Sequence, residues 1–481
     1  MGVLFTAGAS GQINFNDAEI HDFVDDTGGV EFGPTAAAAT FISFRSAVLP
    51  TDSRYTFRGN FVVDATGLVF NDVISGTINE IEAVDDGNTI FTLTGLAMSI
   101  PAFKTFLAAD NTQGFLAAVF AGNDTLLGSD KQDLSDAMAG FAGNDSIVGA
   151  GGSDNLRGDA GNDTLDGGGG SDTLTGGAGN DSLIGGDGND TYVIDSAKDV
   201  ISEAGAELED RVVAPFAVDL TLATFDGIEH VTLTGSGAFK LTGDEFGNML
   251  IGNGGANVLD GGVFTDVLGS DPVDTLIGGA GNDIYIVRET DDVIVELPGG
   301  GIDQVKAFAT YTLSAQVEYL TLLGAGVIHG FGNDLANRII GTDDANFLEG
   351  VAGNDTLIGN GGADTLAGGT GTDIMTGGKG ADQYVVDSLA DKVFEAALPS
   401  IDRDQVVVEI DNYVLAANVE DLTLAGATLA QNGTGNALGN KIEGNSYSFN
   451  TLLGLAGNDT ITGGVGGQDI LLGGVDRKSV V

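Results

Sequence analysis

Aspartates recur every nine residues between residues 143 and 195, and carboxylates at so regular a spacing could hold a row of metal ions. The series is Asp145, Asp154, Asp163, Asp172, Asp181 and Asp190. Around each aspartate the sequence reads Gly-x-Gly-x-Asp-x-U-x or a close variant, where U is a large apolar residue. Calcium takes about six to eight oxygen ligands from carboxylates and carbonyls, and glycine lets backbone carbonyls approach an ion closely. The nonapeptide therefore predicts a calcium-binding turn in every repeat.

The period of nine also predicts the element that positions these turns, a parallel β-roll. The three residues x-U-x would form a short strand, and the six before them a tight turn. Two nonapeptides would make one coil, so that each aspartate lies above the one eighteen residues earlier. Coils stack at about 4.8 Å, where unpaired carboxylates repel. We therefore expect each ion to bridge neighbouring turns on one edge, for example Asp145 with Asp163. Magnesium fits less well because it requires near-ideal octahedral geometry.

The same nonapeptide pattern recurs in three later blocks, whose first turns carry asparagine in place of aspartate. The predicted metal ligands are Asp124, Asp145, Asp154, Asp163, Asp172, Asp181, Asp190, Asp274, Asp283, Asp355, Asp364, Asp373, Asp382, Asp459 and Asp469, with the carbonyls of Gly161, Gly170, Gly179, Gly188, Gly281, Gly353, Gly362 and Gly371. Asp133 and Asp136 compete for the turn after Asp124, and Asp266 is predicted to open a turn in the second block. Turns headed by asparagine, such as Asn337 and Asn346, are predicted to be free of ions because the neutral amide can satisfy the backbone itself.

A second, longer repeat lies between the blocks. Tyr192, Tyr285 and Tyr384 open its three copies at spacings of 93 and 99 residues. Each copy continues through an Asp-x-Val step and a Glu-x-U-Thr-Leu run. Apolar and β-branched residues alternate there, which predicts further β-rungs without glycine turns that the ions do not touch. The tyrosines are interpreted as core plugs at the ends of the metal blocks.

These patterns predict an all-β chain, a parallel β-solenoid of about twenty coils behind a β-rich N-terminal domain. The predicted parts are residues 1–118 (N-terminal domain, interpreted as a cap on the first coil), 119–195, 248–287, 337–386 and 440–475 (nonapeptide blocks), 196–247, 288–336 and 387–439 (spacers), and 476–481 (a non-native tail). Pro101 to Ala118 is predicted to be a short helix. The natural protein is expected to continue past Val475.

The composition excludes several classes of partner and of binding site. The chain has 70 acidic and 18 basic residues and a net charge of −52, which argues against nucleic acid and anionic membranes as partners. It has no cysteine, so disulfides and thiolate metal sites are excluded. No apolar run approaches the length of about 20 residues that a transmembrane helix needs. The 78 glycines are periodic, which indicates turn positions and not flexible linkers.

Residues 119–475 resemble the RTX (hemolysin-type calcium-binding) repeat proteins of Gram-negative bacteria. The resemblance implies type I secretion through an uncleaved C-terminal signal, with the secretion machinery as a partner and an extracellular or cell-surface location. That signal is expected to be missing from this sequence. Carboxylate rows without ions repel, and extracellular calcium modules bind at about 10⁻⁴–10⁻³ M, so the blocks are expected to stay unfolded in the cell and to fold outside it.

The family joins its repeats to proteases, lipases, epimerases, toxins, adhesins and surface-layer proteins, so the fold does not decide the activity. The sequence has neither a His-Glu-x-x-His nor a Gly-x-Ser-x-Gly motif, and His21, His230 and His329 are isolated from one another. We therefore predict no catalytic and no organic-cofactor residues. The favoured role is a structural, adhesive or surface-associated module, with cell-surface polysaccharide or other copies of the chain as candidate partners. The alternative is the repeat region of a secreted enzyme or toxin whose active domain is residues 1–118 or lies beyond Val475, and an extracellular calcium buffer is a third option.

Overall fold

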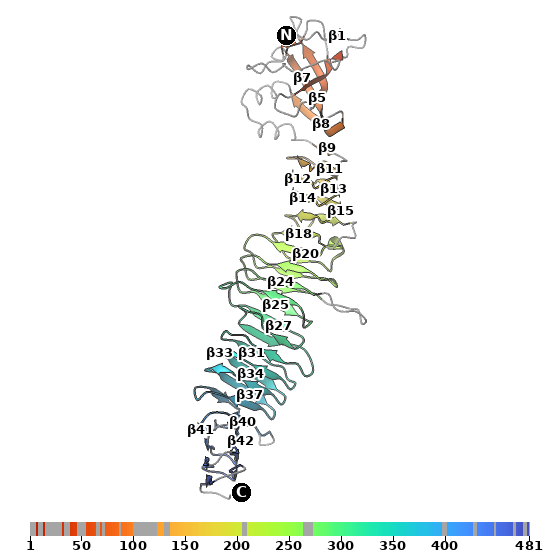
Figure 1. Ribbon diagram of the computed structural model, residues 1–481. Helices are drawn as coiled ribbons and strands as arrows, with labels where there is room; N and C mark the ends of the chain where they lie inside the picture. Colours follow the sequence, from red (N-terminus) through yellow and green to blue (C-terminus); the bar gives the residue numbers. More distant parts are fainter. Residues whose placement is uncertain are drawn as a thin grey trace. The chain divides into compact units, whose positions relative to one another are not determined.

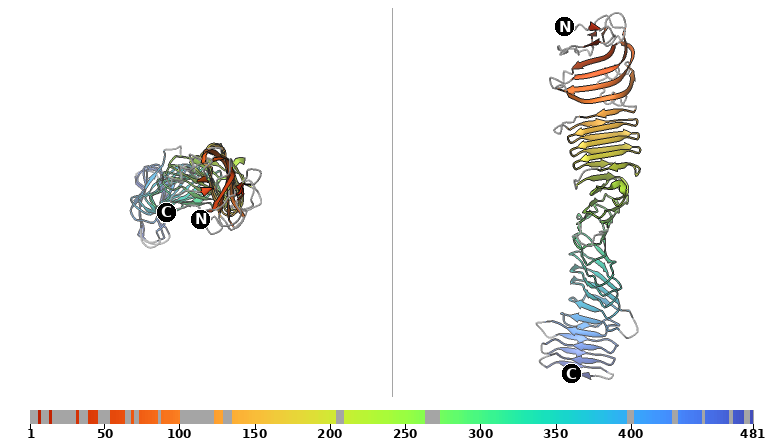
Figure 2. Two further views of the ribbon diagram at one scale, coloured as in Figure 1. Left: turned by 90° about the horizontal axis from the view of Figure 1, so that it is seen from above. Right: turned by 90° about the vertical axis from the view of Figure 1, so that its right-hand side faces the viewer.

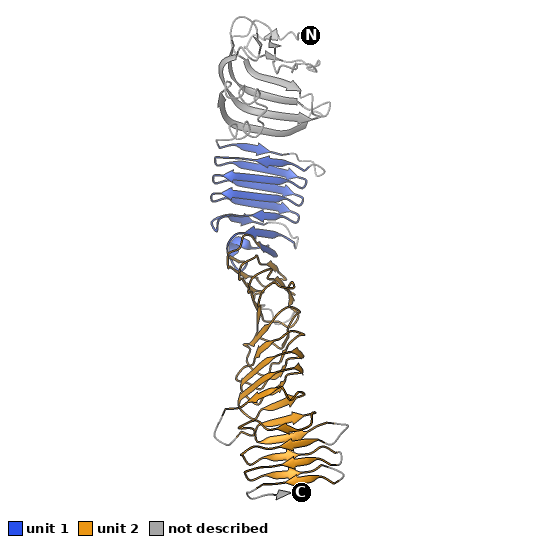
Figure 3. Cartoon of the chain, turned by 90° about the vertical axis from the view of Figure 1, so that its left-hand side faces the viewer, with its two compact units in different colours: residues 1–216, 220–232 blue, residues 217–219, 233–481 orange. Residues whose placement is uncertain are grey.

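The computed structural model describes residues 123–128, 135–203, 209–262, 273–396, 402–426, 431–446, 449–464 and 468–474, together with the backbone of short strands in residues 1–99 and 479–480. The helix predicted from Pro101 to Ala118 lies outside these residues. The chain divides into two compact units, residues 1–216 with 220–232 and residues 217–219 with 233–481 (Figure 3). Among the described residues, no helix is long and apolar enough to cross a membrane.

The N-terminal part of the first unit contains an antiparallel sheet (Figure 1). Its strands, in order across the sheet, are β4 (Ala39–Arg45), β5 (Arg54–Val63), β7 (Val73–Asp85) and β8 (Asn88–Ser99). The two-residue strands β1 (Thr6–Ala7), β2 (Ile13–Asn14), β3 (Glu31–Phe32) and β6 (Leu68–Val69) form two small separate pairs. Strand β8 pairs antiparallel with β9, the first strand of the solenoid. The antiparallel sheet therefore occupies a strand edge that would otherwise be open to other chains.

The rest of the first unit is a parallel solenoid with two sheets, one holding the odd-numbered strands to β17 and one the even-numbered strands to β20 (Figure 2). The elements are β9 (Thr125–Leu127), β10 (Ala137–Ala139), β11 (Ser146–Gly151), β12 (Asn155–Ala160), β13 (Thr164–Gly169), β14 (Thr173–Ala178), β15 (Ser182–Asp187), β16 (Thr191–Val193), β17 (Val200–Ser202), β18 (Arg211–Ala214), the 3-10 helix η2 (Ala223–Phe225) and β20 (His230–Leu233). Ile147 pairs with Leu165, and Leu165 with Leu183, so each coil takes eighteen residues. This confirms the predicted parallel β-roll.

The second unit continues the same plan through spacers and nonapeptide blocks alike. Its strands are β19 (Val218–Asp219), β21 (Lys240–Thr242), β22 (Met249–Ile251), β23 (Val258–Asp260), β24 (Thr275–Ile277), β25 (Ile284–Val287), β26 (Val293–Val295), β27 (Gln304–Ala307), β28 (Tyr311–Thr312), β29 (Tyr319–Leu322), β30 (Gly330–Phe331), β31 (Arg338–Ile340), β32 (Phe347–Glu349), β33 (Ala352–Gly353), β34 (Thr356–Gly361), β35 (Thr365–Ala367), β36 (Thr370–Gly371), β37 (Ile374–Lys379), β38 (Gln383–Val386), β39 (Lys392–Phe394), β40 (Gln405–Val408), β41 (Tyr413–Val414), β42 (Asp421–Leu424), β43 (Asn432–Thr434), β44 (Lys441–Glu443), β45 (Thr451–Leu453), β46 (Thr460–Thr462), β47 (Ile470–Leu472) and β48 (Ser479–Val480). Strand β48, in the predicted non-native tail, pairs with β46. Together the units contain about 17 solenoid turns, fewer than the twenty predicted.

Each sheet contributes one row of apolar side chains to the solenoid core. Leu156 and Leu174 in one sheet and Leu183 in the other are fully buried, while the residues beside them in the strands remain partly exposed. Burying one such side chain contributes about 1.5–3 kcal/mol, and each coil has only a few such side chains. Tyr192 and Tyr285 are also fully buried in the core, in keeping with their interpretation as core plugs.

The strand register changes in the second block. Strand β22 pairs directly with β24, so that Met249 lies beside Thr275 at an offset of 26 residues. Asp266, which is predicted to open a turn in this block, lies in residues 263–272, outside the described residues.

Candidate metal-binding turns

From Asp145 onward, the first carboxylate oxygen of each aspartate in the ladder accepts a hydrogen bond from the coil before it. Asp163 Oδ1 accepts a hydrogen bond of 2.8 Å from the backbone N–H of Asp145, and Asp172 Oδ1 accepts one of 2.7 Å from Asp154. The same contact ties Asp274 to Asn248, Asp459 to Asn440 and Asp469 to Asn450. One oxygen of each carboxylate is thus committed to joining successive coils.

The second carboxylate oxygen has no hydrogen-bond partner among the described residues in most of these turns. Oδ2 is buried and has no hydrogen-bond partner among the described residues in Asp145, Asp154, Asp163, Asp172, Asp181, Asp283, Asp355, Asp364, Asp373 and Asp382. In Asp124 both carboxylate oxygens are in this condition. A buried charged oxygen without a partner costs several kcal/mol unless something compensates it. Ten such atoms in a regular row point to a ligand that the protein chain does not supply.

These oxygens face a space that only glycine leaves free. A Cβ added at Gly167 would lie under 3.0 Å from Oδ2 of Asp172 and 2.8 Å from the carbonyl oxygen of Gly185, in the next coil. Gly149 and Gly359 have the same surroundings, with Asp154 and Asp364 as their carboxylates. Carboxylate and carbonyl oxygens are the donors that calcium takes. The donor set therefore fits a hard divalent cation lying between two coils.

The glycine two residues before each aspartate is required by the backbone. All eight predicted glycines have positive φ, from 102° at Gly362 to 159° at Gly179, and the others are Gly161, Gly170, Gly188, Gly281, Gly353 and Gly371. A Cβ at Gly170 would also overlap the carbonyl oxygen of Gly152, one coil earlier. These positions exclude other residues both by conformation and by the closeness of the stacked turns.

Comparison with known families agrees with this geometry. The family model of the RTX calcium-binding nonapeptide repeat (4 copies) matches residues 139–174, 166–201, 240–268, 273–294, 331–366, 349–384 and 440–477. The chain contains RTX calcium-binding repeats. It is also similar to the endo-1,3-1,4-beta-glycanase ExsH of Rhizobium meliloti (strain 1021), at 40% identity over 67 residues. That match covers 14% of this chain and 14% of the glycanase.

Burial raises the pKa values of the ladder carboxyls. Loss of hydration raises the pKa of Asp172 to about 6 and that of Asp364 to about 7, and the neighbouring carboxylates Asp154 and Asp382 add to the effect. The pKa of Asp274 rises to about 8, for the same first reason and because of Asp292. Each shift reflects the free-energy cost of an ionised carboxylate at these positions when no cation compensates it.

Calcium binding by the RTX blocks should therefore weaken steeply in weak acid. The ion needs ionised carboxylates, and protons compete for them as the pH falls through about 6–7. We expect the calcium concentration at half-saturation to rise about tenfold or more between pH 7.5 and 5.5. Without calcium the sign reverses: the raised pKa values favour the folded state below about pH 4, and this advantage disappears as the pH rises through 6–7. Calcium titrations followed by circular dichroism test both trends, and a half-saturation independent of pH would contradict them.

In the turns headed by Asn337 and Asn346, the side-chain amide forms its hydrogen bonds with the protein backbone. Asn337 Oδ1 accepts a 2.7 Å hydrogen bond from the N–H of Asn333, and its Nδ2 donates to the carbonyl of Val317. Asn346 does the same with Thr342 and with Ile328. The space beside the turn glycine is then filled by an oxygen that already has a donor. Asn248 departs from this pattern, because its Nδ2 has no partner among the described residues.

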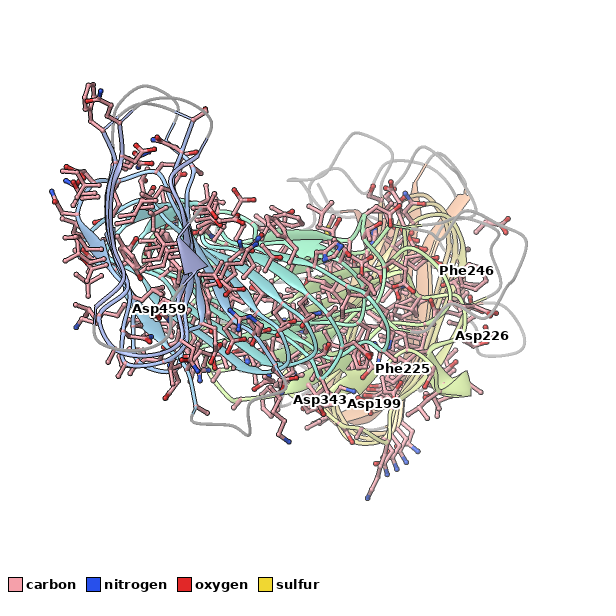
Figure 4. All side chains as sticks on the ribbon, turned by 90° about the horizontal axis from the view of Figure 1, so that it is seen from below. Asp199, Phe225, Asp226, Phe246, Asp343 and Asp459 are labelled. Carbon is pink, nitrogen blue, oxygen red and sulfur yellow. The ribbon has the colours of Figure 1, made fainter. Side chains whose placement is uncertain are left out.

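The acidic ladder extends further than the sequence prediction. Asp136 heads the turn before Asp154, because its N–H donates to Asp154 Oδ1 at 2.7 Å, and Asp133 lies outside the described residues. Further ladder residues that the sequence reasoning missed are Asp199 (labelled in Figure 4), Asp292 and Asp391, together with Asp210, Asp303 and Asp404, each of which is followed in the next coil by Glu229, Glu318 or Glu420. The first three lie eighteen residues after a predicted ligand, so the coil period was a signal that could have found them.

Proposed function

We propose that the aspartates and turn glycines named above bind several calcium ions and that this binding folds the RTX blocks after export from the cell. The observation that carries the proposal is the set of buried Oδ2 atoms that have no partner among the described residues, each beside a turn glycine. At Asp154, Asp163, Asp172, Asp355 and Asp364, a carbonyl from the next coil faces the same space. An ion there would compensate the carboxylate that faces it. It would also join two coils that share little apolar surface.

The site is tested by removing charge without removing the coil-to-coil hydrogen bond. In the variant Asp163→Asn with Asp181→Asn, the amide oxygen can still accept the backbone N–H. The matched control is Asp166→Asn, because Asp166 is partly exposed in β13 and outside the ladder. Equilibrium dialysis should show fewer calcium ions per chain for the double variant and an unchanged number for the control. A full complement of ions in the double variant would refute the ligand assignment.

For the biological role, we propose a secreted structural or adhesive module at the cell surface. RTX repeats are typical of secreted proteins, and most of the described residues belong to solenoid coils. Export by a type I system follows from the family resemblance, and contact with surface polysaccharide or other copies of the chain is the partner class that an extended array of coils could serve.

One observation favours a second candidate, the repeat region of a secreted polysaccharide-degrading enzyme. The glycanase ExsH shares a 67-residue segment at 40% identity with this chain. Incubating the calcium-loaded chain with mixed-linkage β-glucan and measuring reducing ends tests whether the active domain of such an enzyme lies within this chain. If the chain is a structural module, it should release no reducing ends above a heat-denatured control, and steady release would favour the enzyme.

A further inference from the structure

Three groups of acidic side chains stand where nonapeptide blocks end. The groups are Asp190, Glu203 and Asp210; Asp283, Glu296 and Asp303; and Asp382, Glu395 and Asp404. In each group, one carboxylate oxygen from each residue lies within 4.8 Å of the other two. The glutamates were not among the residues that the sequence predicted to bind metal.

A buried tyrosine completes each group. The hydroxyl of Tyr285 donates to Glu296, that of Tyr192 to Glu203 and that of Tyr384 to Glu395. The tyrosine and glutamate are always eleven residues apart. The groups therefore repeat as units, although the distance from one tyrosine to the next changes from 93 to 99 residues.

An independent observation points to a ligand in these groups. Oδ2 of Asp283 and Oδ2 of Asp382 belong to residues that are 1% exposed, and neither atom has a hydrogen-bond partner among the described residues. A Cβ added at Gly278 would meet Asp283 Oδ2, Glu296 Oε1 and the Tyr285 hydroxyl, all closer than 3.0 Å. The unpartnered oxygen is thus aimed into the space on which the other two converge.

This arrangement differs from the turns inside a block. Beside Gly167, the space is closed by Asp172 and by the carbonyl of Gly185, supplied by the next coil. Beside Gly185 itself, the nearest atoms are the Tyr192 hydroxyl and the carboxylates of Asp190 and Glu203. Eighteen residues after Gly185, where the regular repeat would place another turn glycine, the sequence has Glu203, and its carboxylate and the tyrosine hydroxyl take the place of the carbonyl.

We propose that each of these three groups is a calcium site of a second type, which closes its RTX block with three carboxylates and a tyrosine hydroxyl. All the donors are hard oxygens, and three carboxylates in so small a space require a cation of high charge. Calcium tolerates the irregular geometry of such a set better than magnesium does. The inference rests on the proposed function for the identity of the ion and for one aspartate of each group (Asp190, Asp283 or Asp382), whereas the glutamates and the tyrosine hydroxyls are donors that the proposed function does not use.

Terbium luminescence can detect these sites selectively. Terbium replaces calcium and emits when a nearby excited tyrosine transfers energy to it, and the chain has eight tyrosines and no tryptophan. We expect strong tyrosine-sensitised emission from the calcium-competent chain, displaced by added calcium. The variant Glu203→Gln, Glu296→Gln, Glu395→Gln should lose most of that emission and bind three fewer calcium ions. The control Glu245→Gln, Glu349→Gln, Glu409→Gln, at positions outside the groups, should keep both.

The outcomes separate the two proposals. Unchanged ion number and unchanged emission in the glutamine variant would overturn the second type of site and leave a tyrosine–glutamate hydrogen bond with no ion. A wild-type chain that binds no calcium at all would overturn the proposed function instead. If the triple variant does not fold, as judged by circular dichroism, each single glutamine variant should lose one of the three contributions to the emission, and retention of all three would count against the proposal.

Discussion

With a calcium chelator at pH 7.5, the chain is expected to lose the β-structure of its RTX blocks, and millimolar calcium is expected to restore it. Without ions, the ladder on one edge stacks Asp145, Asp163 and Asp181 in successive coils, each with a buried oxygen that nothing compensates. The narrow apolar core, with about one inward-facing side chain per short strand, cannot offset both the cost of these buried charges and the loss of chain entropy on folding so many glycines. Far-ultraviolet circular dichroism with chelator and during a calcium titration measures the transition.

Two controls distinguish specific binding from charge screening. Sodium chloride at matched ionic strength weakens repulsion among the 70 acidic residues without occupying the turns. Magnesium supplies the same charge as calcium with a stricter geometry. We expect neither salt to restore the β-signal at concentrations where calcium does. Strand content that chelator leaves unchanged would contradict the coupling of folding to calcium. At a free calcium concentration one hundred times the Kd, each bound ion would add about 2.7 kcal/mol to the free energy of unfolding.

The architecture could be predicted from the sequence because two periods coincide in it. A nonapeptide places its apolar residue inward once per strand, so the pairing of Ile147 with Leu165 follows from the repeat alone. Glycine two residues before the aspartate is a backbone necessity, as the φ of 143° at Gly161 illustrates. Both features are local and therefore readable from residue types and spacing.

What the sequence could not provide depends on contacts between coils. Glu296 directly follows β26, and the pairing of β24 with β26, together with that of β25 with β27, brings it beside Asp283 and Asp303. The offset of 26 residues between the paired strands β22 and β24 departs from the period of eighteen, and spacing alone does not predict that pairing. The roles of Asn337 and Asn333 likewise appear only when their donors and acceptors are known. Spacing identifies a repeat, but it does not show which departures from the repeat are functional.

Substituting alanine for Gly170 is expected to cost far more than the same substitution at Gly169, its neighbour in the chain. Gly170 has a φ of 123°, and a Cβ there would overlap the carbonyl oxygen of Gly152 in the coil before. The forbidden backbone conformation alone costs about 1–3 kcal/mol. The overlap must also push apart two coils that are expected to share an ion. Gly170→Ala should therefore raise the calcium concentration at the midpoint of folding several-fold and lower the thermal midpoint of the calcium-loaded chain.

Gly169→Ala is the matched control, because it makes the same chemical change one residue away in β13. The nearest atom to a Cβ at Gly169 is the carbonyl oxygen of Ala150 at 4.0 Å, an ordinary contact. Replacing glycine where the backbone permits it stabilises a fold by about 0.4–1 kcal/mol, since the unfolded chain loses freedom. The two variants should thus move the calcium midpoint in opposite directions. Equal midpoints would mean that the close stacking of turns does not limit folding, and that the glycines serve only local chain reversal.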